Sequence, residues 1–332
     1  MAPARSGHKS IAWGDLSESK QLDVLVALQK RRGAALRRAS DNVLAVGLGH
    51  RTKAGEVREE LCLGVLVQKK SGRAKEQVPA TVTTTIEHEG RRRRVEVPTD
   101  VEELGSGGPQ HALAATSATN AANGIIVTSP SAPAIAAKGS VCAVVQLQGQ
   151  PDVFVLSCHH VLTLSEKLGK CRVLADAVVA DTRRVPYAQL FEYVPITPGK
   201  KSQLDAAISL VQPGHSVTWA HSGARPVRVD FGTSKPVNCT IYAPGRLLGA
   251  TYVKTWSEVR LQYHGCVVQI AAAYQFAAAT MDGDSGSPVI SPDGTLHGMH
   301  FWGNPANGLA LSIPAGLLFQ AGAFQSGTLQ LA

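Results

Sequence analysis

A serine flanked by glycines is the feature of this sequence that could most readily do covalent chemistry. It lies in the segment DGDSGSPVIS (282–291), where Gly283 precedes Ser285 by two residues and Gly286 follows it. A serine hydroxyl that attacks a carbonyl needs backbone N–H donors to stabilise the developing oxyanion. Gly283 allows a turn in which its own N–H and that of Ser285 face one point. Ser285 is thus a candidate nucleophile, with Gly283 and Ser285 as oxyanion-hole donors, although a Gly-Asp-Ser turn also occurs by chance.

A nucleophilic serine also needs a base and a group that orients the base, and two further segments offer them. The segment VLSCHHVLT (155–163) places His159 and His160 after a short apolar strand. An imidazole is the base that activates a serine hydroxyl. In QLDAAISLV (203–211), Asp205 opens an apolar run, where a carboxylate could accept the imidazole N–H and fix its tautomer. Taken singly, the histidines could be surface residues and the aspartate a turn residue.

These three segments occur in the order His, Asp, Ser, with spacings of 45 and 80 residues from His160 to Asp205 to Ser285. With these residues the sequence resembles the trypsin/chymotrypsin superfamily of serine peptidases, and most closely its disulfide-free intracellular and bacterial branch. In that branch the histidine segment reads like LSNNHVL, and LSCHHVL matches it with two substitutions. The resemblance implies a catalytic triad of His160, Asp205 and Ser285. It also implies a mainly β fold, a double six-stranded antiparallel β-barrel, over about residues 122–325.

The resemblance further implies which residues form the substrate pocket. These are Ala279, Thr280, His300, Phe301, Trp302 and Gly303. Trypsin-like enzymes carry an acid where this chain has Ala279, so we expect no cleavage after Lys or Arg. Thr280 and His300 resemble the pocket residues of glutamyl endopeptidases and of the chymotrypsin-fold proteases of picornaviruses, which implies cleavage after Glu or Gln. The alternative is that His300 is a core histidine beside an apolar pocket.

Asp284 precedes the nucleophile, and in zymogen-type relatives this residue pairs with a newly cut N-terminal amine. The sequence has no IVGG-like start, and NGIIV (123–127) is only a faint candidate for one. We therefore expect Asp284 to have a different partner. Activity would then be controlled by the N-terminal part of the chain or by a bound protein.

The elements around these segments predict a small α+β domain followed by a β-rich one. Apolar residues at three- and four-residue spacing predict a helix over residues 15–39. Two hairpins should follow, over 42–70 and 81–98. Short apolar runs separated by turn residues then continue to the end of the chain. We expect an α+β domain at 1–104, a linker at 105–121 and a protease domain at 122–332, whose barrels cover about 122–220 and 221–325.

Composition and cysteine usage narrow the class of protein. The six cysteines show no CxxC spacing, and no phosphate-binding glycine loop follows a strand, so we expect neither a metal nor another cofactor. The sequence shows no signal peptide and no apolar run long enough for a membrane span. We therefore expect a cytoplasmic protein with free thiols and no membrane partner.

The basic run Arg91–Arg94 has two interpretations. The net charge is +8, but no aromatic residues are interleaved with these arginines. We interpret them as a solvated edge strand and disfavour nucleic-acid binding.

The sequence as a whole predicts a regulated serine endopeptidase that acts on protein or peptide substrates. A cytoplasmic protease with a leader domain fits a bacterial stress or anti-phage context, with residues 1–104 contacting a regulatory protein. One alternative is a catalytically silent protease fold used as a scaffold, although a scaffold does not need an intact triad. The other alternative is a nucleic-acid-binding or partner-binding protein that acts through its basic N-terminal domain.

Overall fold

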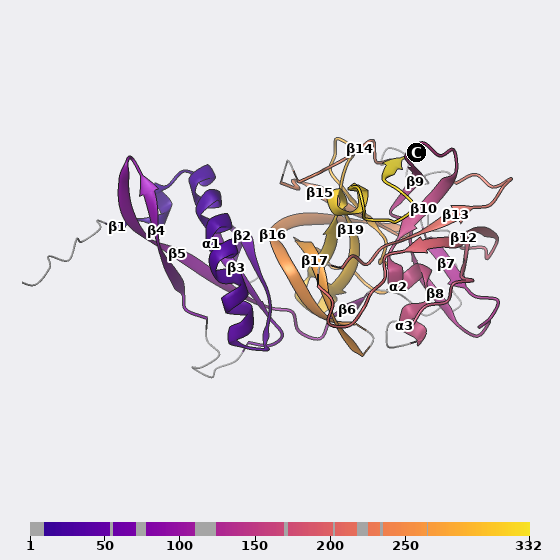
Figure 1. Cartoon of the computed structure of the whole chain (residues 1–332), viewed down its shortest axis with the longest axis horizontal. Helices are drawn as coiled ribbons and strands as arrows, with labels where there is room; N and C mark the ends of the chain where they lie inside the picture. The colour runs from indigo at the N-terminus through magenta and orange to yellow at the C-terminus, as the bar shows by residue number, and fades with distance from the viewer. Residues whose placement is uncertain are drawn as a thin grey trace, which may run out of the picture. The chain divides into compact units, whose positions relative to one another are not determined.

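The structure is a computed structural model that describes residues 10–53, 56–70, 78–109, 124–168, 172–201, 203–217, 225–232, 235–263 and 265–332. No helix among these residues is both long enough and apolar enough to cross a bilayer. The chain divides into two compact units. The first runs to Gly105 and also includes Val253–Ser257, whereas the second comprises Ser106–Tyr252 and Glu258–Ala332. Figure 1 labels the elements of both, and each unit is described on its own below.

The first unit is built on one long helix, α1 (Glu18–Ala39). It begins at Ser17, whose side chain accepts a hydrogen bond from the Lys20 N–H, and Arg37 lies in its last turn, where a cation suits the helix dipole. The predicted helix over 15–39 is thus confirmed apart from its start. The chain forms the short 3-10 helix η1 (Trp13–Asp15) before α1 begins. The indole N–H of Trp13 donates to the Leu61 carbonyl, which fixes this segment before the helix.

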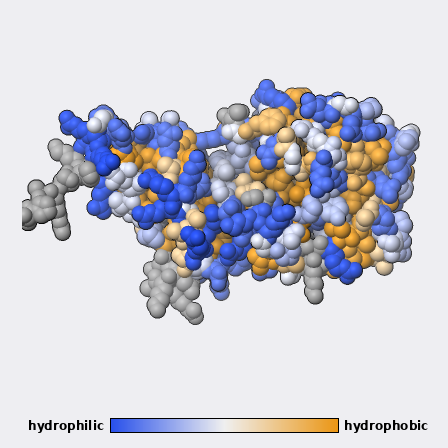
Figure 2. All heavy atoms as spheres, in the orientation of Figure 1, coloured by the Kyte–Doolittle hydropathy of each residue, from blue (hydrophilic) through white to orange (hydrophobic). Residues whose placement is uncertain are grey.

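The strands of the first unit form a sheet against α1. Both predicted hairpins are present. β2 (Val43–Lys53) pairs antiparallel with β3 (Glu56–Val67), and β4 (Thr81–His88) with β5 (Arg91–Glu103). β5 also runs parallel to β3 and to β1 (Ser10–Ile11). The apolar side of α1, including Leu25 and Leu28, packs on the valines and leucines of this sheet. On the face drawn in Figure 2, hydrophilic side chains cover much of this unit.

The first unit contains a strand segment that comes from much later in the chain. Residues Val253–Ser257 belong to the long strand β16 (Arg246–Tyr263), and Lys254–Ser257 pair antiparallel with β2. Lys254 in this segment is fully buried, and its ammonium group binds Asp100 at 2.9 Å and also Glu102. The Thr52 N–H donates to Asp100 at 2.8 Å, which adds a further donor to the cluster.

The second unit is mainly β, as predicted, and contains two sheets. Its first sheet has the strand order β21-β9-β10-β13-β12-β11-β7-β8. The strands are β7 (Gly124–Thr128), β8 (Ala136–Ser140), β9 (Ala143–Leu147), β10 (Val153–Ser157), β11 (Val178–Ala180), β12 (Pro186–Tyr193), β13 (Ala207–Val211) and β21 (Leu329–Leu331). Two short helices, α2 (His159–Leu162) and α3 (Ser165–Leu168), follow β10 directly.

The second sheet of this unit has β19 at its centre. β18 and β20 flank β19, β15 pairs with β18, and β17 pairs with β20. The strands are β15 (Cys239–Ala243), β17 (Cys266–Ala277), β18 (Pro288–Ile290), β19 (Thr295–Asn304) and β20 (Leu309–Pro314), with the remainder of β16 pairing with β15. Two short strands, β6 (Gly108–Pro109) and β14 (Arg228–Val229), also pair with β19. The turn η3 (Pro305–Asn307) follows β19, and α4 (Ala315–Phe319) follows β20.

Candidate active site

The pairing of two strands brings His160 and Asp205 together. β10 and β13 run antiparallel, with Ser157 opposite Ala207. His160 follows Ser157 by three residues, in α2, and Asp205 precedes Ala207 by two. The imidazole Nδ1 lies 2.7 Å from Asp205 Oδ2, and the His160 backbone N–H donates to Asp205 Oδ1 at 3.1 Å. Both side chains are fully buried. The predicted imidazole–carboxylate pair is therefore formed, and it involves His160.

A tyrosine that the sequence analysis did not single out completes this pair. The Tyr263 hydroxyl donates to Asp205 Oδ2 and lies 2.7 Å from His160 Nδ1. Its ring meets the imidazole edge-on, with the ring centres 5.7 Å apart. Burial opposes ionisation of Asp205, but the charge and hydrogen bond of His160, together with the Tyr263 hydrogen bond, hold the pKa of that carboxyl below its usual value. Asp205 is therefore a buried anion at neutral pH.

The serine elbow packs against the strands that deliver the histidine. Gly286 has a φ of +92°, and a Cβ there would lie 2.0 Å from the Ser140 carbonyl oxygen and 2.3 Å from Ser157 Oγ. Ser157 ends β10, directly before the segment that carries His160. The Ser285 carbonyl accepts from the Ser140 N–H at 2.8 Å. Only glycine fits this close approach, which sets the candidate nucleophile beside the end of β10, the strand that precedes the helix carrying His160.

The backbone around Ser285 is tightly bonded. The Ser285 hydroxyl donates to the Phe301 carbonyl at 3.3 Å, and the Gly286 N–H donates to the His300 carbonyl at 2.8 Å. Gly283 has a φ of +99°, which favours glycine there. This conformation is compatible with the predicted oxyanion role of Gly283 and Ser285, which stays a prediction.

Asp284 has an internal partner. The Arg246 guanidinium, at the start of β16, binds Asp284 Oδ2, which also accepts from the Met281 N–H at 2.7 Å. Burial raises the pKa of Asp284, and the bonds to Arg246 and to the Met281 N–H oppose that rise. Ile125, the faint candidate for a new N-terminus, lies within β7 and pairs with Gly139 of β8. Sequence reasoning missed Arg246 because nothing near it in the sequence marks it.

The predicted pocket residues lie on two segments of the second unit. Thr280 is buried directly before the serine elbow, whereas Ala279 beside it is exposed. The other four, His300 to Gly303, are consecutive and buried in β19. Burial lowers the pKa of His300 to about 3, so this imidazole is neutral at physiological pH. Their role as a specificity pocket stays a prediction.

Cys158 lies close to His160 and Asp205, so these three could present ligand atoms to a metal ion. Burial raises the pKa of the Cys158 thiol well above its ordinary value, and the thiol donates to the His300 carbonyl at 3.3 Å. In this structure the three residues are held by hydrogen bonds, from Cys158 to the His300 carbonyl and between His160 and Asp205.

Comparison with known proteins identifies the class. The family model described as Trypsin matches residues 150–315, which is half of the chain and includes the segments of His160, Asp205 and Ser285. The chain therefore belongs to the trypsin family and is a serine endopeptidase, and the trypsin-like fold predicted from the sequence is confirmed. No curated protein matches it.

The solved structures that match part of this chain share little sequence with it. The Rv3671c protease of M. tuberculosis in its active form is 19% identical, and the match covers 60% of this chain and 78% of that one with a TM-score of 0.39. Thermobifida fusca Protease A is 9% identical, with coverage of 59% and 89% and a TM-score of 0.38. Cellulomonas bogoriensis chymotrypsin is also 9% identical, with coverage of 59% and 90% and the same TM-score.

Proposed function

We propose that Ser285, His160 and Asp205 form a catalytic triad that cleaves peptide bonds of protein substrates. The observation that carries this proposal is the buried bond from His160 Nδ1 to the Asp205 carboxylate, formed beside the glycine-flanked elbow of Ser285. Asp205 fixes the tautomer in which Nδ1 carries the proton, so that Nε2 can accept the proton of the serine hydroxyl.

The reaction then follows from this arrangement. Ser285 Oγ attacks the substrate carbonyl as His160 takes its proton, and the backbone N–H groups of Gly283 and Ser285 stabilise the oxyanion. His160 returns the proton to the leaving amine, which leaves an ester on Ser285. Water deprotonated by His160 then hydrolyses the ester, and the buried Asp205 anion stabilises each imidazolium that forms.

A fluorophosphonate probe and a peptide library test the triad together. We expect the probe to label Ser285 of the wild-type chain, and wild type to cleave library peptides. Ser285→Ala should do neither. A wild-type chain that neither reacts nor cleaves would support the scaffold alternative and contradict the proposal.

We propose that the pocket selects Glu or Gln. His300 is buried and neutral, so its ring N–H can donate to a carbonyl or carboxylate of a side chain without carrying a charge of its own. Buried Thr280 offers a hydroxyl for the same purpose. His300→Val should therefore reduce cleavage after Glu and Gln much more than after Leu. An equal loss on all three substrates would show that His300 has only a packing role.

We propose a reducing cytoplasm as the working compartment, as the sequence predicts. The described cysteines, which are Cys62, Cys142, Cys158, Cys239 and Cys266, are free thiols. Cys171 lies outside the described residues. The bacterial stress or anti-phage context stays a prediction.

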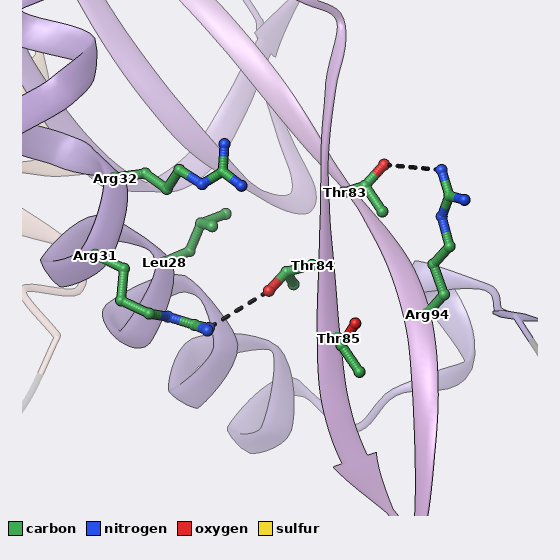
Figure 3. A pocket seen from close by; sticks show the side chains of 7 residues that line it. All are labelled: Leu28, Arg31, Arg32, Thr83, Thr84, Thr85 and Arg94. Atoms are coloured by element: carbon green, nitrogen blue, oxygen red, sulfur yellow. Dashed lines mark hydrogen bonds between the residues drawn. The ribbon is translucent and has the colours of Figure 1, made fainter. Parts of the chain in front are cut away.

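We also propose that a protein partner regulates the enzyme by binding the first unit at a basic hollow (Figure 3). The hollow has a volume of about 520 Å³, and its lining residues are Leu28, Arg31, Arg32, Thr83, Thr84, Thr85 and Arg94. Thr84 faces α1, where its hydroxyl accepts from Arg31 at 3.4 Å, whereas Thr83 accepts from Arg94 at 3.5 Å on the opposite side of the strand.

The lining of the hollow indicates the chemistry of a partner that could bind there. The lining comes from both faces of β4, so an occupant lies along the edge of that strand. Among the described residues β4 pairs with β5 alone, which leaves its other edge for an added strand. Alternate side chains of that added strand would face Arg31 and Arg32 on one side and Arg94 on the other. An extended acidic peptide matches this charge.

Anisotropy of a labelled acidic peptide, acetyl-EVEVEVE, on Ser285→Ala protein tests this docking. We expect about tenfold weaker binding for Arg31→Gln/Arg32→Gln, and wild-type binding for Arg38→Gln, which removes a charge of the same helix outside the hollow. N-methylation of alternate peptide residues should abolish binding in one register and spare it in the other. Equal binding of both methylated peptides, or of single-stranded DNA at the same arginines, would contradict strand addition.

A further inference from the structure

Ser140, the last residue of β8, is buried and bonds twice to the segment of the candidate nucleophile. Its N–H donates to the Ser285 carbonyl at 2.8 Å, and its hydroxyl donates to the Gly283 carbonyl at 3.2 Å. Gly283 and Ser285 are the two residues whose N–H groups are the predicted oxyanion-hole donors. One residue of the first sheet of this unit therefore binds the carbonyls of both.

Ser140 is itself held by two further buried serines. The Ser287 hydroxyl donates to Ser140 Oγ at 3.0 Å, and the Ser157 hydroxyl donates to the Ser140 carbonyl at 2.6 Å. A hydroxyl has one proton to donate and can accept as well. The side-chain bonds therefore form a chain with one direction, from Ser287 to Ser140 and from Ser140 to the Gly283 carbonyl.

This hydroxyl chain ends on the peptide group between Gly283 and Asp284. The carbonyl of that peptide accepts from Ser140, and its N–H, on Asp284, donates to the Met281 carbonyl at 3.1 Å. Gly283 has a φ of +99°, and a glycine backbone rotates more freely than that of other residues. The peptide that follows Gly283 is thus the part of the elbow that most needs to be fixed.

The peptide group after the nucleophile is fixed in a different way. The Ser285 carbonyl accepts from the Ser140 N–H, and the Gly286 N–H donates to the His300 carbonyl at 2.8 Å. Both of these bonds join backbone to backbone, so they persist when side chains are replaced. The bond to the Gly283 carbonyl comes from a side chain, and a substitution at position 140 can therefore remove it alone.

We propose that Ser140 and Ser287 are positioning residues, whose hydroxyl chain keeps the elbow in the conformation that stabilises the oxyanion. The inference rests on the proposed triad. Oxyanion-hole donors are effective because they are oriented before the charge develops. With its carbonyl bonded to Ser140, the peptide after Gly283 cannot rotate and turn the Gly283 N–H away. Because this effect appears in the transition state, loss of the chain should lower kcat and leave KM unchanged.

Hydrolysis of a fluorogenic peptide, with a sequence that wild type cleaves in the library, tests the role of Ser140. We expect Ser140→Ala to lower kcat about 30-fold with KM unchanged, because a loosened donor loses part of the effect of removing one. Ser209→Ala is the matched control and should have the kcat of wild type. Ser209 is a fully buried serine of β13 whose hydroxyl has no hydrogen-bond partner among the described residues.

Two further variants test the direction of the chain. Ser287→Ala leaves the Ser140 hydroxyl its acceptor but removes the bond that orients it, so we expect kcat to fall only about fivefold. Ser140→Ala/Ser287→Ala should be no slower than Ser140→Ala alone, because Ser287 acts only through Ser140. A double variant whose loss is the product of the two single losses would contradict the chain.

A peptide aldehyde of the same sequence separates positioning from packing. It forms a hemiacetal with Ser285, whose oxyanion occupies the same hole as that of the reaction. We expect the inhibition constant of the aldehyde to rise in Ser140→Ala by about the factor by which kcat falls. Wild-type affinity for the aldehyde, or an equal fall of kcat in Ser209→Ala, would show that the Ser140 hydroxyl only packs.

Reaction with a fluorophosphonate distinguishes failure of this inference from failure of the enzyme assignment. If wild type reacts at Ser285 and Ser140→Ala cleaves the peptide at the wild-type rate, the triad stands and the positioning role is wrong. If wild type neither reacts nor cleaves, the proposed function is wrong and this inference falls with it.

Discussion

Each of the two units contains a buried pairing of a basic side chain with carboxylates, and the two pairings differ in the basic residue. In the first unit, Lys254 binds Asp100 and Glu102. In the second, His160 binds Asp205, which also accepts from Tyr263. Burial opposes the charge of Lys254, but Glu102, Cys62 and Asp100 outweigh it and raise the pKa of the ammonium above its ordinary value.

The two clusters differ in whether a proton can move. An ammonium whose pKa is raised from 10.5 keeps its proton throughout the physiological range, so its cluster is permanently charged and can only hold strands together. An imidazole can gain and lose a proton near neutral pH, so the same kind of ion pair becomes a proton carrier. The type of cation therefore distinguishes the lysine pair, which can only be structural, from the histidine pair, for which we propose a catalytic role.

Replacing the carboxylate of the proposed triad gives the largest expected effect. Asp205→Asn keeps the shape of the side chain but no longer favours the imidazole tautomer with its proton on Nδ1. We expect kcat for a peptide substrate to fall by about 10⁴ while the chain stays folded. Peptide hydrolysis and circular dichroism measure the two effects. A loss below tenfold would mean that the His160–Asp205 pair is structural, like the lysine cluster.

Replacing Lys254 should reduce the stability of the fold and leave the reactivity of Ser285 unchanged. Lys254→Met leaves Asp100 and Glu102 without their cation, and we expect the free energy of unfolding to fall by about 3–5 kcal/mol. Urea unfolding measures this loss, and fluorophosphonate labelling of the protein that remains folded should be unchanged. The triple variant Lys254→Met/Asp100→Leu/Glu102→Leu should recover much of the stability. No recovery would show that packing, and not the unpaired charge, causes the loss.

A second buried imidazole, His159, sharpens the comparison because no carboxylate among the described residues bonds to its ring. Burial lowers the pKa of His159 to about 4, from 6.5 for an exposed histidine. As pH falls from 7 to 5, the unfolded chain binds a proton here that the folded chain does not, so stability falls by about 2 kcal/mol from this residue. His159→Phe should flatten the pH dependence of the free energy of unfolding by that amount. An unchanged slope would mean that His159 titrates alike in both states.

Replacing Tyr263 gives the smallest expected effect of these substitutions. Tyr263→Phe removes one of the hydrogen bonds that lower the pKa of Asp205, which leaves the carboxylate a stronger partner for the protonated form of His160. The acid limb of the kcat profile, which reports protonation of the proposed base, should therefore move to higher pH. We expect kcat to fall about tenfold with KM unchanged. Tyr193→Phe, whose ring packs against His159, is the matched control. Loss of stability with an unmoved pH profile would make Tyr263 a packing residue only.

The residues of the proposed triad and elbow could be singled out from the sequence because their chemistry limits their identity. His160, Asp205 and the elbow glycines stand in short patterns that few other residues could satisfy. Tyr263 and Arg246 lie in the long strand β16, where nothing adjacent marks them. They matter only because the fold brings them to Asp205 and Asp284.

Some elements of the fold could be predicted from the sequence and others could not. Helix α1, the two hairpins and the β-rich second unit follow from the spacing of apolar residues. β6 does not, because a glycine-rich run carries turn signals whether or not a neighbouring strand pairs with it. The pairing of β2 with residues 254–257 could not be predicted either, because neither sequence segment indicates a partner strand some 200 residues away.

That late segment has a consequence for synthesis. The first unit needs Lys254 and its neighbours to complete its sheet and neutralise Asp100 and Glu102. A ribosome must therefore complete 257 of the 332 residues before the amino-terminal unit can finish folding. Until then, β2 keeps an open edge and the two carboxylates stay solvated. Amino-terminal domains usually fold first during synthesis, but this unit can complete its sheet only after residues 253–257 have been made.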